Sequence, residues 1–294
     1  MAKRLQDLTI IDNFMFGAVM SNEENCRLLL ERILDIPIDH VVVTTEKTLV
    51  YHPNFKGIRL DVYAKDENNT LYNVEMQVEH TPIPKRSRYY HAQMGMEMIA
   101  TGADYDQLPE TYVIFICNYD PFGLKKYRYT FSTRCEESPD LLLNDGIHTI
   151  ILNNRGQNPE DISPELLSFL NFTKATLEES EDKSDDPYVT QIQRYIRHIK
   201  HDRETEKQYM LLELMLKESE KKGVQMGVEK GRDEILTMHK DFLTTFLSKL
   251  GQVPPELTDK IQSLNDPEAL QTLIFEAARV SSVDDFVKIF HQLT

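Results

Sequence analysis

Two strand-like segments joined by a short polar stretch constrain the fold of this chain more than any other feature. Residues 57–65 read GIRLDVYAK and residues 71–79 read LYNVEMQVE, and both alternate apolar and polar side chains with a period of two. The intervening DENNT consists of residues that favour turns. The sequence therefore predicts an antiparallel hairpin with one apolar face and one face that carries Asp61, Glu75 and Gln77.

The pairing register decides whether these polar side chains meet. Opposite residues of an antiparallel pair point to the same face, so Asp61 must pair with an odd-numbered residue such as Glu75 or Gln77. This pairing requires a loop of odd length, for instance three residues. A two-residue turn would pair Asp61 with Met76 and put the carboxylates on opposite faces of the sheet.

The segments around the hairpin predict an α/β unit. The pattern S-N-E-E places Ser21 as the N-cap of a helix and Glu24 at the reciprocal capping position, and Pro37 closes this helix. Helix, strands, helix and strands then follow one another, as in an α/β or α+β core that ends near residue 175. We expect a helix over residues 84–101, ended by Gly102, and strands over residues 41–50, 111–119, 125–131 and 148–153.

The chain changes character after this core. Residues 178–186 carry six acids and one lysine, and we place an acidic linker at 176–187 between a domain over 1–175 and a helical region over 188–294. The last part of that region reads as three short helices, with Asp266-Pro267 and Ser281-Ser282 at the starts of the last two.

Three glycines recur every four residues within the helical region. On a continuous helix they line one face and permit the close approach of a partner backbone, at a cost of about 1 kcal/mol each. A frayed helix or a linker explains the same spacing equally well. We expect this region to serve as an oligomerisation or partner surface, with a homodimer as the simplest case; the residues are Gly223, Gly227 and Gly231.

Composition bounds the functional classes. The formal net charge of −15 opposes nucleic-acid binding, although the local field near a site matters more than this average. No stretch approaches the ~18–20 apolar residues of a membrane span, and acids interrupt the apolar run at the N-terminus, so we expect neither a membrane segment nor a signal peptide. The 3 cysteines have no metal-ligand spacing and are expected to be reduced. We expect a cytoplasmic protein.

The polar face of the hairpin suits phosphodiester hydrolysis. That reaction needs an activated water and stabilisation of developing charge, which divalent metals held by carboxylates supply. Mg²⁺ requires few protein oxygens because it keeps several waters. Two carboxylates and one backbone carbonyl are therefore sufficient, and a polar row in a buried sheet is costly unless it binds something.

These segments resemble the PD-(D/E)XK nuclease family transposases, the Rpn-type recombination-promoting nucleases. The resemblance covers roughly the first 155 residues and includes GIRLDVYAKDENNTLYNVEMQVEHTPIPKRSRYYHAQM, LTIIDNFMFGAVMSNEENCRLLLERIL, LPETYVIFICNYDPFG, RYTFSTRCEE and LNDGIHTIILN. It implies a restriction-endonuclease-like core, a mixed sheet flanked by helices, followed here by an all-α C-terminal region. It also implies a DNA substrate and a Mg²⁺ cofactor that Mn²⁺ replaces.

The same resemblance assigns roles to residues of the hairpin. Asp61 and Glu75 take the positions of the metal-binding carboxylates, with the backbone carbonyl of Met76 as a further ligand. Gln77 takes the third catalytic position, where the general pattern has lysine. A neutral amide can orient a water but cannot act as a base, so we expect slow, strongly metal-dependent hydrolysis.

The helix after the hairpin offers candidate DNA contacts. Its first turn carries Lys85, Arg86 and Arg88, which could meet phosphates beside the metal or could be solvated. Tyr89 and Gln93 are four residues apart and share a helix face, from which they could hold the hairpin or a phosphate. We expect a surface or packing position rather than the role of a base for His91, turn capping from Asp12, and a supporting or merely exposed position for Glu79.

Three functions compete at this point. The first is a metal-dependent DNA endonuclease of low sequence specificity, associated with recombination, mobile elements or defence against foreign DNA. The second is a catalytically weak DNA-binding or oligomeric scaffold that keeps the nuclease fold, which Gln77 and the acidic charge favour. The third is a protein-interaction module centred on residues 188–294.

Overall fold

The computed structural model describes residues 3–49, 58–99 and 104–293. Its contacts divide the chain into two units, Met1–Met210 and Leu211–Thr294. The first unit has a mixed sheet flanked by helices and the second is helical, which confirms the predicted fold class.

The strands of the first unit form one sheet. In the part of the chain that is described, the sheet has six strands in the order β1-β2-β3-β4-β6-β5. The central strand β3 pairs antiparallel with β2 and parallel with β4, β4 pairs parallel with β6, and β6 pairs antiparallel with β5. The bounds are β1 (Val41–Leu49), β2 (Ile58–Asp66), β3 (Leu71–Gln77), β4 (Thr111–Cys117), β5 (Arg128–Phe131) and β6 (Ile147–Asn153).

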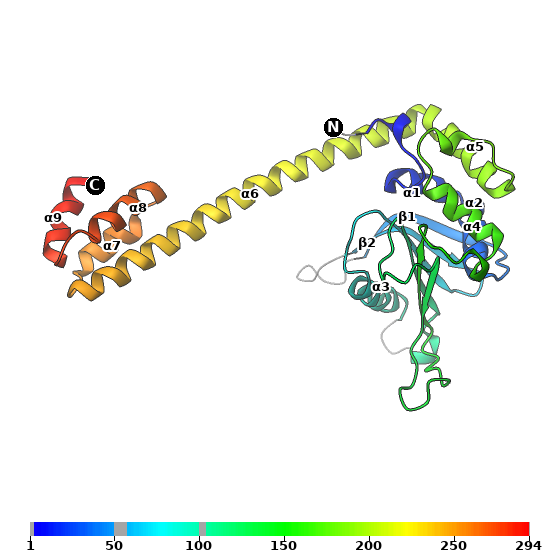
Figure 1. Cartoon of the computed structure of the whole chain (residues 1–294), viewed down its shortest axis with the longest axis horizontal. Coiled ribbons are helices and arrows are strands. Elements are labelled where there is room, and N and C mark those ends of the chain that lie inside the picture. The colour runs from blue at the N-terminus through cyan, green and yellow to red at the C-terminus, as the bar shows by residue number, and fades with distance from the viewer. Residues whose placement is uncertain (1–2, 50–57, 100–103, 294) are drawn as a thin grey trace. The chain divides into compact units, whose positions relative to one another are not determined.

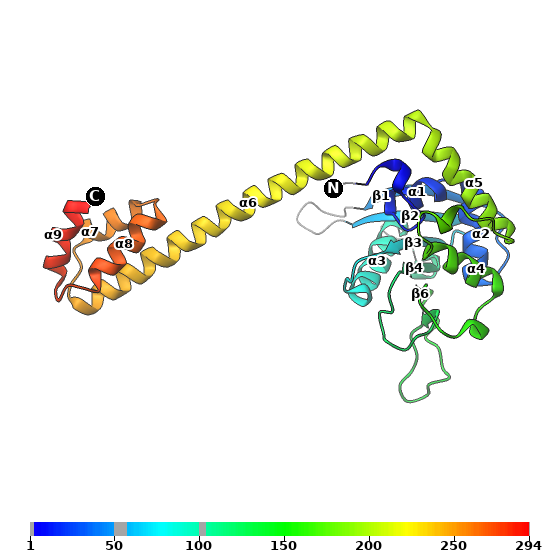
Figure 2. The same ribbon diagram turned by 45° about the horizontal axis from the view of Figure 1, so that its top comes forward.

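Helices cover both faces of this sheet. One face packs against α3, whereas the other packs against α1, α2, α4 and α5 in the larger core cluster (Figures 1 and 2). The bounds are α1 (Asn13–Met20), α2 (Glu23–Leu34), α3 (Ile83–Met98), α4 (Pro164–Thr173) and α5 (Pro187–His201), with 3₁₀ turns at Leu5–Asp7, Tyr105–Gln107, Pro159–Asp161 and Glu179–Glu181.

Several predicted boundaries shift by a few residues. The N-cap of α2 is Asn22, whose side chain accepts from the Asn25 amide, so the prediction of Ser21 was one residue early. Both residues are good caps, and the sequence pattern alone does not separate them. Strand β5 is shorter than predicted. Gly102 and the predicted strand ends at residues 50 and 57 lie outside the described residues.

The β2–β3 hairpin has the odd-length loop that the register requires. Val62 pairs with Val74, and the neighbouring pairs keep the same register, so the three residues 67–69 form the loop. Asn69 adopts φ 65°, a left-handed conformation that asparagine tolerates. The buried Asp66 carboxylate accepts the amides of Asn68 and Thr70 at 2.9 and 2.8 Å and fixes the loop.

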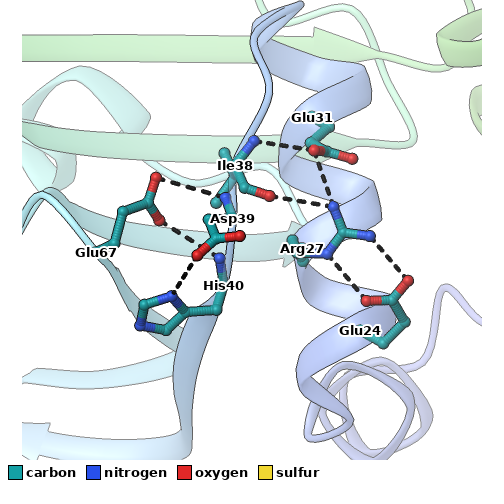
Figure 3. A network of polar contacts seen from close by, with 7 residues as sticks. All are labelled: Glu24, Arg27, Glu31, Ile38, Asp39, His40 and Glu67. Atoms are coloured by element: carbon teal, nitrogen blue, oxygen red, sulfur yellow. Dashed lines mark hydrogen bonds and ion pairs between the residues drawn. The ribbon is translucent and has the colours of Figure 1, made fainter.

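A polar network attaches this loop to the segment that enters β1 (Figure 3). The Glu67 carboxylate accepts the backbone amides of Asp39 and His40, both at 3.4 Å. On the other side of the segment, Arg27 of α2 donates to the Ile38 carbonyl at 3.1 Å. The hairpin tip is therefore held against the strand beside it.

Helix α5 packs within the first unit, although it follows the acidic segment. Ile192 is fully buried in the larger core cluster, together with Tyr188 and Ile196. Asp186, the N-cap of α5, forms two hydrogen bonds of 2.9 Å with the Arg32 guanidinium of α2. The first unit thus extends beyond the domain predicted at 1–175.

The second unit consists of α6 (Arg203–Leu250) from Leu211 onward and three short helices. These are α7 (Pro255–Ser263), α8 (Pro267–Ala277) and α9 (Val283–Leu293), as the sequence predicts. Asp266 caps α8, and Ser282 accepts the Asp285 amide at the start of α9. Helix α6 continues through the three spaced glycines without a break. Across the described ranges, no helix has the length and apolarity needed to cross a membrane.

The packing of α5 predicts a stability effect. Replacement of Ile192 by Ala leaves a cavity in the larger core, and we expect the free energy of unfolding to fall by about 2–5 kcal/mol. Urea unfolding followed by circular dichroism measures this change. Arg194→Ala, at an exposed position of the same helix, serves as the control. Equal stability of the two variants would show that α5 is not part of this core.

Candidate active site

The β2–β3 ladder ends where the predicted carboxylates lie. Val62 and Val74 form the last pair at this end, and the same register places Asp61 opposite Glu75 on the face covered by α3. The Asp61 amide donates to Glu75 Oε1 at 3.2 Å rather than to the backbone of β3. The end of the ladder therefore brings the two acidic residues together.

Glu75 is more deeply buried than Asp61. Its residue is 3% exposed, whereas Asp61 is half-buried. Glu75 Oε1 also accepts from Asn73 Nδ2 at 3.1 Å, and Oε2 accepts from Arg86 Nη2 at 2.9 Å. Burial, followed by the negative charge of Asp61, raises the pKa of Glu75 to about 7.

Gln77 lies on the same face, two residues further along β3. It is 7% exposed, its Nε2 donates to the Glu79 carbonyl, and its Oε1 accepts from Arg86 Nη1. The predicted trio of Asp61, Glu75 and Gln77 is thus assembled at one place. Met76, between the last two, packs its side chain into the larger core on the opposite face.

Helix α3 supplies one of its predicted cations to this place. Arg86 reaches Glu75 and Gln77, whereas Lys85 and Arg88 are exposed in the same part of the helix. Tyr89 is half-buried against the cluster beneath α3, and Gln93 is 8% exposed.

Tyr90 and Asn73 belong to the site but were not among the predicted site residues. Tyr90 Oη accepts from Arg86 Nη2 at 2.7 Å, and Asn73 donates to Glu75. The spacing of Arg86 and Tyr90, four residues apart, was a usable signal, because such residues share a helix face.

Two other polar residues lie outside this group of contacts. His91 is buried, and its ring nitrogens hydrogen-bond with Thr111 and Thr149 at 2.8 and 3.1 Å. Burial, followed by the charge of His148, lowers the pKa of His91 to about 4. Asp12 accepts the Thr9 amide at 2.8 Å within a turn. Both arrangements agree with the packing and capping roles expected from the sequence.

The donor set fits a hard divalent cation. Among residues 3–49, 58–99 and 104–293, no three His, Cys, Asp or Glu side chains gather as a metal cluster. Mg²⁺ does not need such a cluster, because waters complete its coordination. The Asp61 amide contacts the Glu75 carboxylate, so the two residues are close enough for their carboxylates to share one cation.

The raised pKa of Glu75 predicts an NMR titration. In the metal-free protein we expect the Glu75 carboxyl to titrate near pH 7, and we expect Asp61→Asn to lower its pKa because one cause of the increase is removed. Because the pKa of Glu75 is higher in the folded than in the unfolded protein, protonation of Glu75 stabilises the fold. This contribution to the free energy of unfolding is complete below about pH 4.5 and is lost as the pH rises through about 7.

Carbon-13 NMR of labelled glutamate measures this titration. Glu165→Gln, at an exposed position of α4, serves as the control and should leave the Glu75 midpoint unchanged. A Glu75 midpoint near the ordinary value, or one that Asp61→Asn does not lower, would contradict the prediction.

Comparison with known proteins identifies the family. The family model described as PD-(D/E)XK nuclease family transposase matches residues 10–224. No curated protein and no solved structure matches the chain. Because the family model covers well over half of the sequence and includes the strands that carry Asp61 and Glu75, the chain belongs to the PD-(D/E)XK nuclease family transposases.

Proposed function

We propose that this protein is a divalent-metal-dependent endodeoxyribonuclease with low sequence specificity. The observation that carries the proposal is the contact of Asp61 with Glu75 just beyond the last pair of the β2–β3 ladder, where the Asp61 amide donates to the Glu75 carboxylate. Family membership supports nuclease chemistry in general. A role in recombination, mobile elements or defence against foreign DNA is part of the same proposal.

In the proposed site, Asp61 and Glu75 would hold Mg²⁺ or Mn²⁺, with the Met76 backbone carbonyl as a further ligand. The cation would lower the pKa of an attacking water and neutralise charge on the phosphate. Asn73 fixes Glu75 through Oε1, and burial of Glu75 keeps competing water away. Gln77 is too weak a base to take a proton, so it contributes orientation.

DNA binding is proposed along the first turns of α3. Lys85 and Arg88 are exposed and can meet phosphates. Arg86 can then keep its contacts within the protein. Tyr89, which is half-buried, extends the proposed surface along the helix, whereas Gln93 is left out of the proposed DNA contacts because a buried side chain cannot meet a phosphate. These contacts neutralise phosphate locally, which the net charge of −15 does not prevent.

One observation favours the scaffold alternative. Glu75 Oε2 is hydrogen-bonded to Arg86, so a cation within the protein already compensates the buried carboxylate. A protein that never bound metal could keep this arrangement for stability. Cleavage and metal binding must therefore be measured separately.

Cleavage of supercoiled plasmid tests the enzymatic proposal. With Mg²⁺ or Mn²⁺ we expect nicked and linear products, and Asp61→Asn or Glu75→Gln should lower the rate at least about a hundredfold because each removes a metal-binding charge. Glu165→Gln removes an exposed carboxylate of α4, on the other face of the sheet, and should retain the wild-type rate. Intact plasmid with both metals would overturn the enzymatic proposal and favour the scaffold.

Metal binding should depend on pH through Glu75. A cation must displace the proton that Glu75 carries below about pH 7, so the Mn²⁺ affinity should rise about tenfold per pH unit up to that point and then level. Isothermal titration calorimetry without DNA measures the affinity. Glu75→Gln should bind weakly at every pH. Wild-type affinity that does not change with pH would remove Glu75 from the proposed ligand set.

A further inference from the structure

The proposed site holds two carboxylates and must also admit a phosphodiester. All three groups are negative, and charge increases on the phosphate oxygens during hydrolysis. Gln77 is neutral and supplies no compensating charge. A fixed cation beside Gln77 would therefore favour the reaction as well as the fold.

Arg86 is such a cation. Its Nη1 donates to Gln77 Oε1 and, at 3.0 Å, to Thr81 Oγ1. Its Nη2 donates at 2.9 Å to Glu75 Oε2 and at 2.7 Å to Tyr90 Oη, and its Nε donates at 3.2 Å to the same hydroxyl. The guanidinium thus bridges the carboxylate and the amide of β3.

Aromatic rings hold the guanidinium in this position. Its central carbon lies 5.3 Å from the ring centroid of Tyr90 and 5.4 Å from that of Phe115. The Arg86 side chain is 28% exposed, so water screens its charge only partly. A phosphate bound beside Glu75 and Gln77 would meet a preorganised positive charge that offsets one of the two carboxylates.

Gln77 has the orientation that this arrangement needs. Because its Nε2 donates to the Glu79 carbonyl, its Oε1 is the end that faces Arg86. A reversed amide would place two donors against each other. The contacts therefore select an amide at position 77 as the acceptor for a cation that comes from α3.

We propose that Arg86 provides the fixed positive charge of the active site and that Gln77 positions it. This inference rests on the proposed nuclease function. The N–H groups of Arg86 already have acceptors, so the residue acts through its field and by holding Glu75, as a positioning residue rather than by direct hydrogen bonding to the phosphate.

Moving the charge tests this role. Arg86→Met should lower kcat about a hundredfold and leave KM for DNA within a few fold. Adding Gln77→Lys to Arg86→Met places an ammonium next to the vacated position and should restore kcat at least about tenfold. Gln77→Met in the same background adds similar volume without charge and should restore nothing.

Two further variants separate charge from folding. Arg86→Lys and Arg86→Gln both lose the forked guanidinium, but only the first keeps a charge, so Arg86→Lys should be at least about tenfold faster. Circular dichroism verifies that each variant is folded. Lys85→Met, at an exposed neighbouring position, should instead raise KM and leave kcat nearly unchanged.

The outcomes distinguish this inference from the proposed function. If the wild type cleaves DNA but Arg86→Gln matches Arg86→Lys, or if Gln77→Lys gives no restoration in Arg86→Met, Arg86 has only a structural role and the inference is overturned. If the wild type does not cleave, the proposed function fails and the inference fails with it.

Discussion

The register of the β2–β3 hairpin is the constraint on which the rest of the site depends. Side chains on a strand alternate between faces, so a loop one residue shorter would move Asp61 to the face opposite Glu75. Asp66 and the left-handed Asn69 fix the three-residue loop, and Glu67 binds its tip to the segment before β1. The site is therefore specified by residues far from its chemistry, which use ordinary turn and capping contacts.

The register also creates an electrostatic problem, because it places a carboxylate in the interior of the sheet. A buried charge without a partner is severely destabilising, and Glu75 has Asn73 and Arg86 as partners. Burial, followed by the charge of Asp61, nevertheless keeps the pKa of Glu75 raised. A row of polar side chains in a buried sheet can therefore be stable without a bound ligand. What remains unusual is that the compensation leaves Asp61 half-buried beside Glu75, with repulsion that a divalent cation would relieve.

Local patterns predicted the strands, the face of each hairpin residue and the caps of the last helices, because these features depend on neighbours in sequence. The remaining features depend on distant contacts. The rotation of α3 about its axis, set by packing of Ile83 and Met94 under the helix, turns Arg86 and Tyr90 toward β3, whereas the residue spacing alone also allowed the face that carries Tyr89. Likewise, α5 joins the first unit through bonds between residues more than 150 positions apart, such as Arg32 with Asp186, which no periodicity reveals.

The location of the positive charge also depends on contacts between residues that are distant in sequence. A cation on β3 would be fixed by strand geometry alone, whereas Arg86 reaches the site only when α3 is packed on the sheet and Gln77 presents its oxygen. The charge balance of the site then depends on tertiary structure, so loosening α3 would leave Glu75 uncompensated and, in the proposed nuclease, would remove the positive charge beside the phosphate. Coupling of this kind makes an amide at position 77 compatible with an active site: the strand supplies the acceptor, the helix supplies the charge, and neither is sufficient without the other.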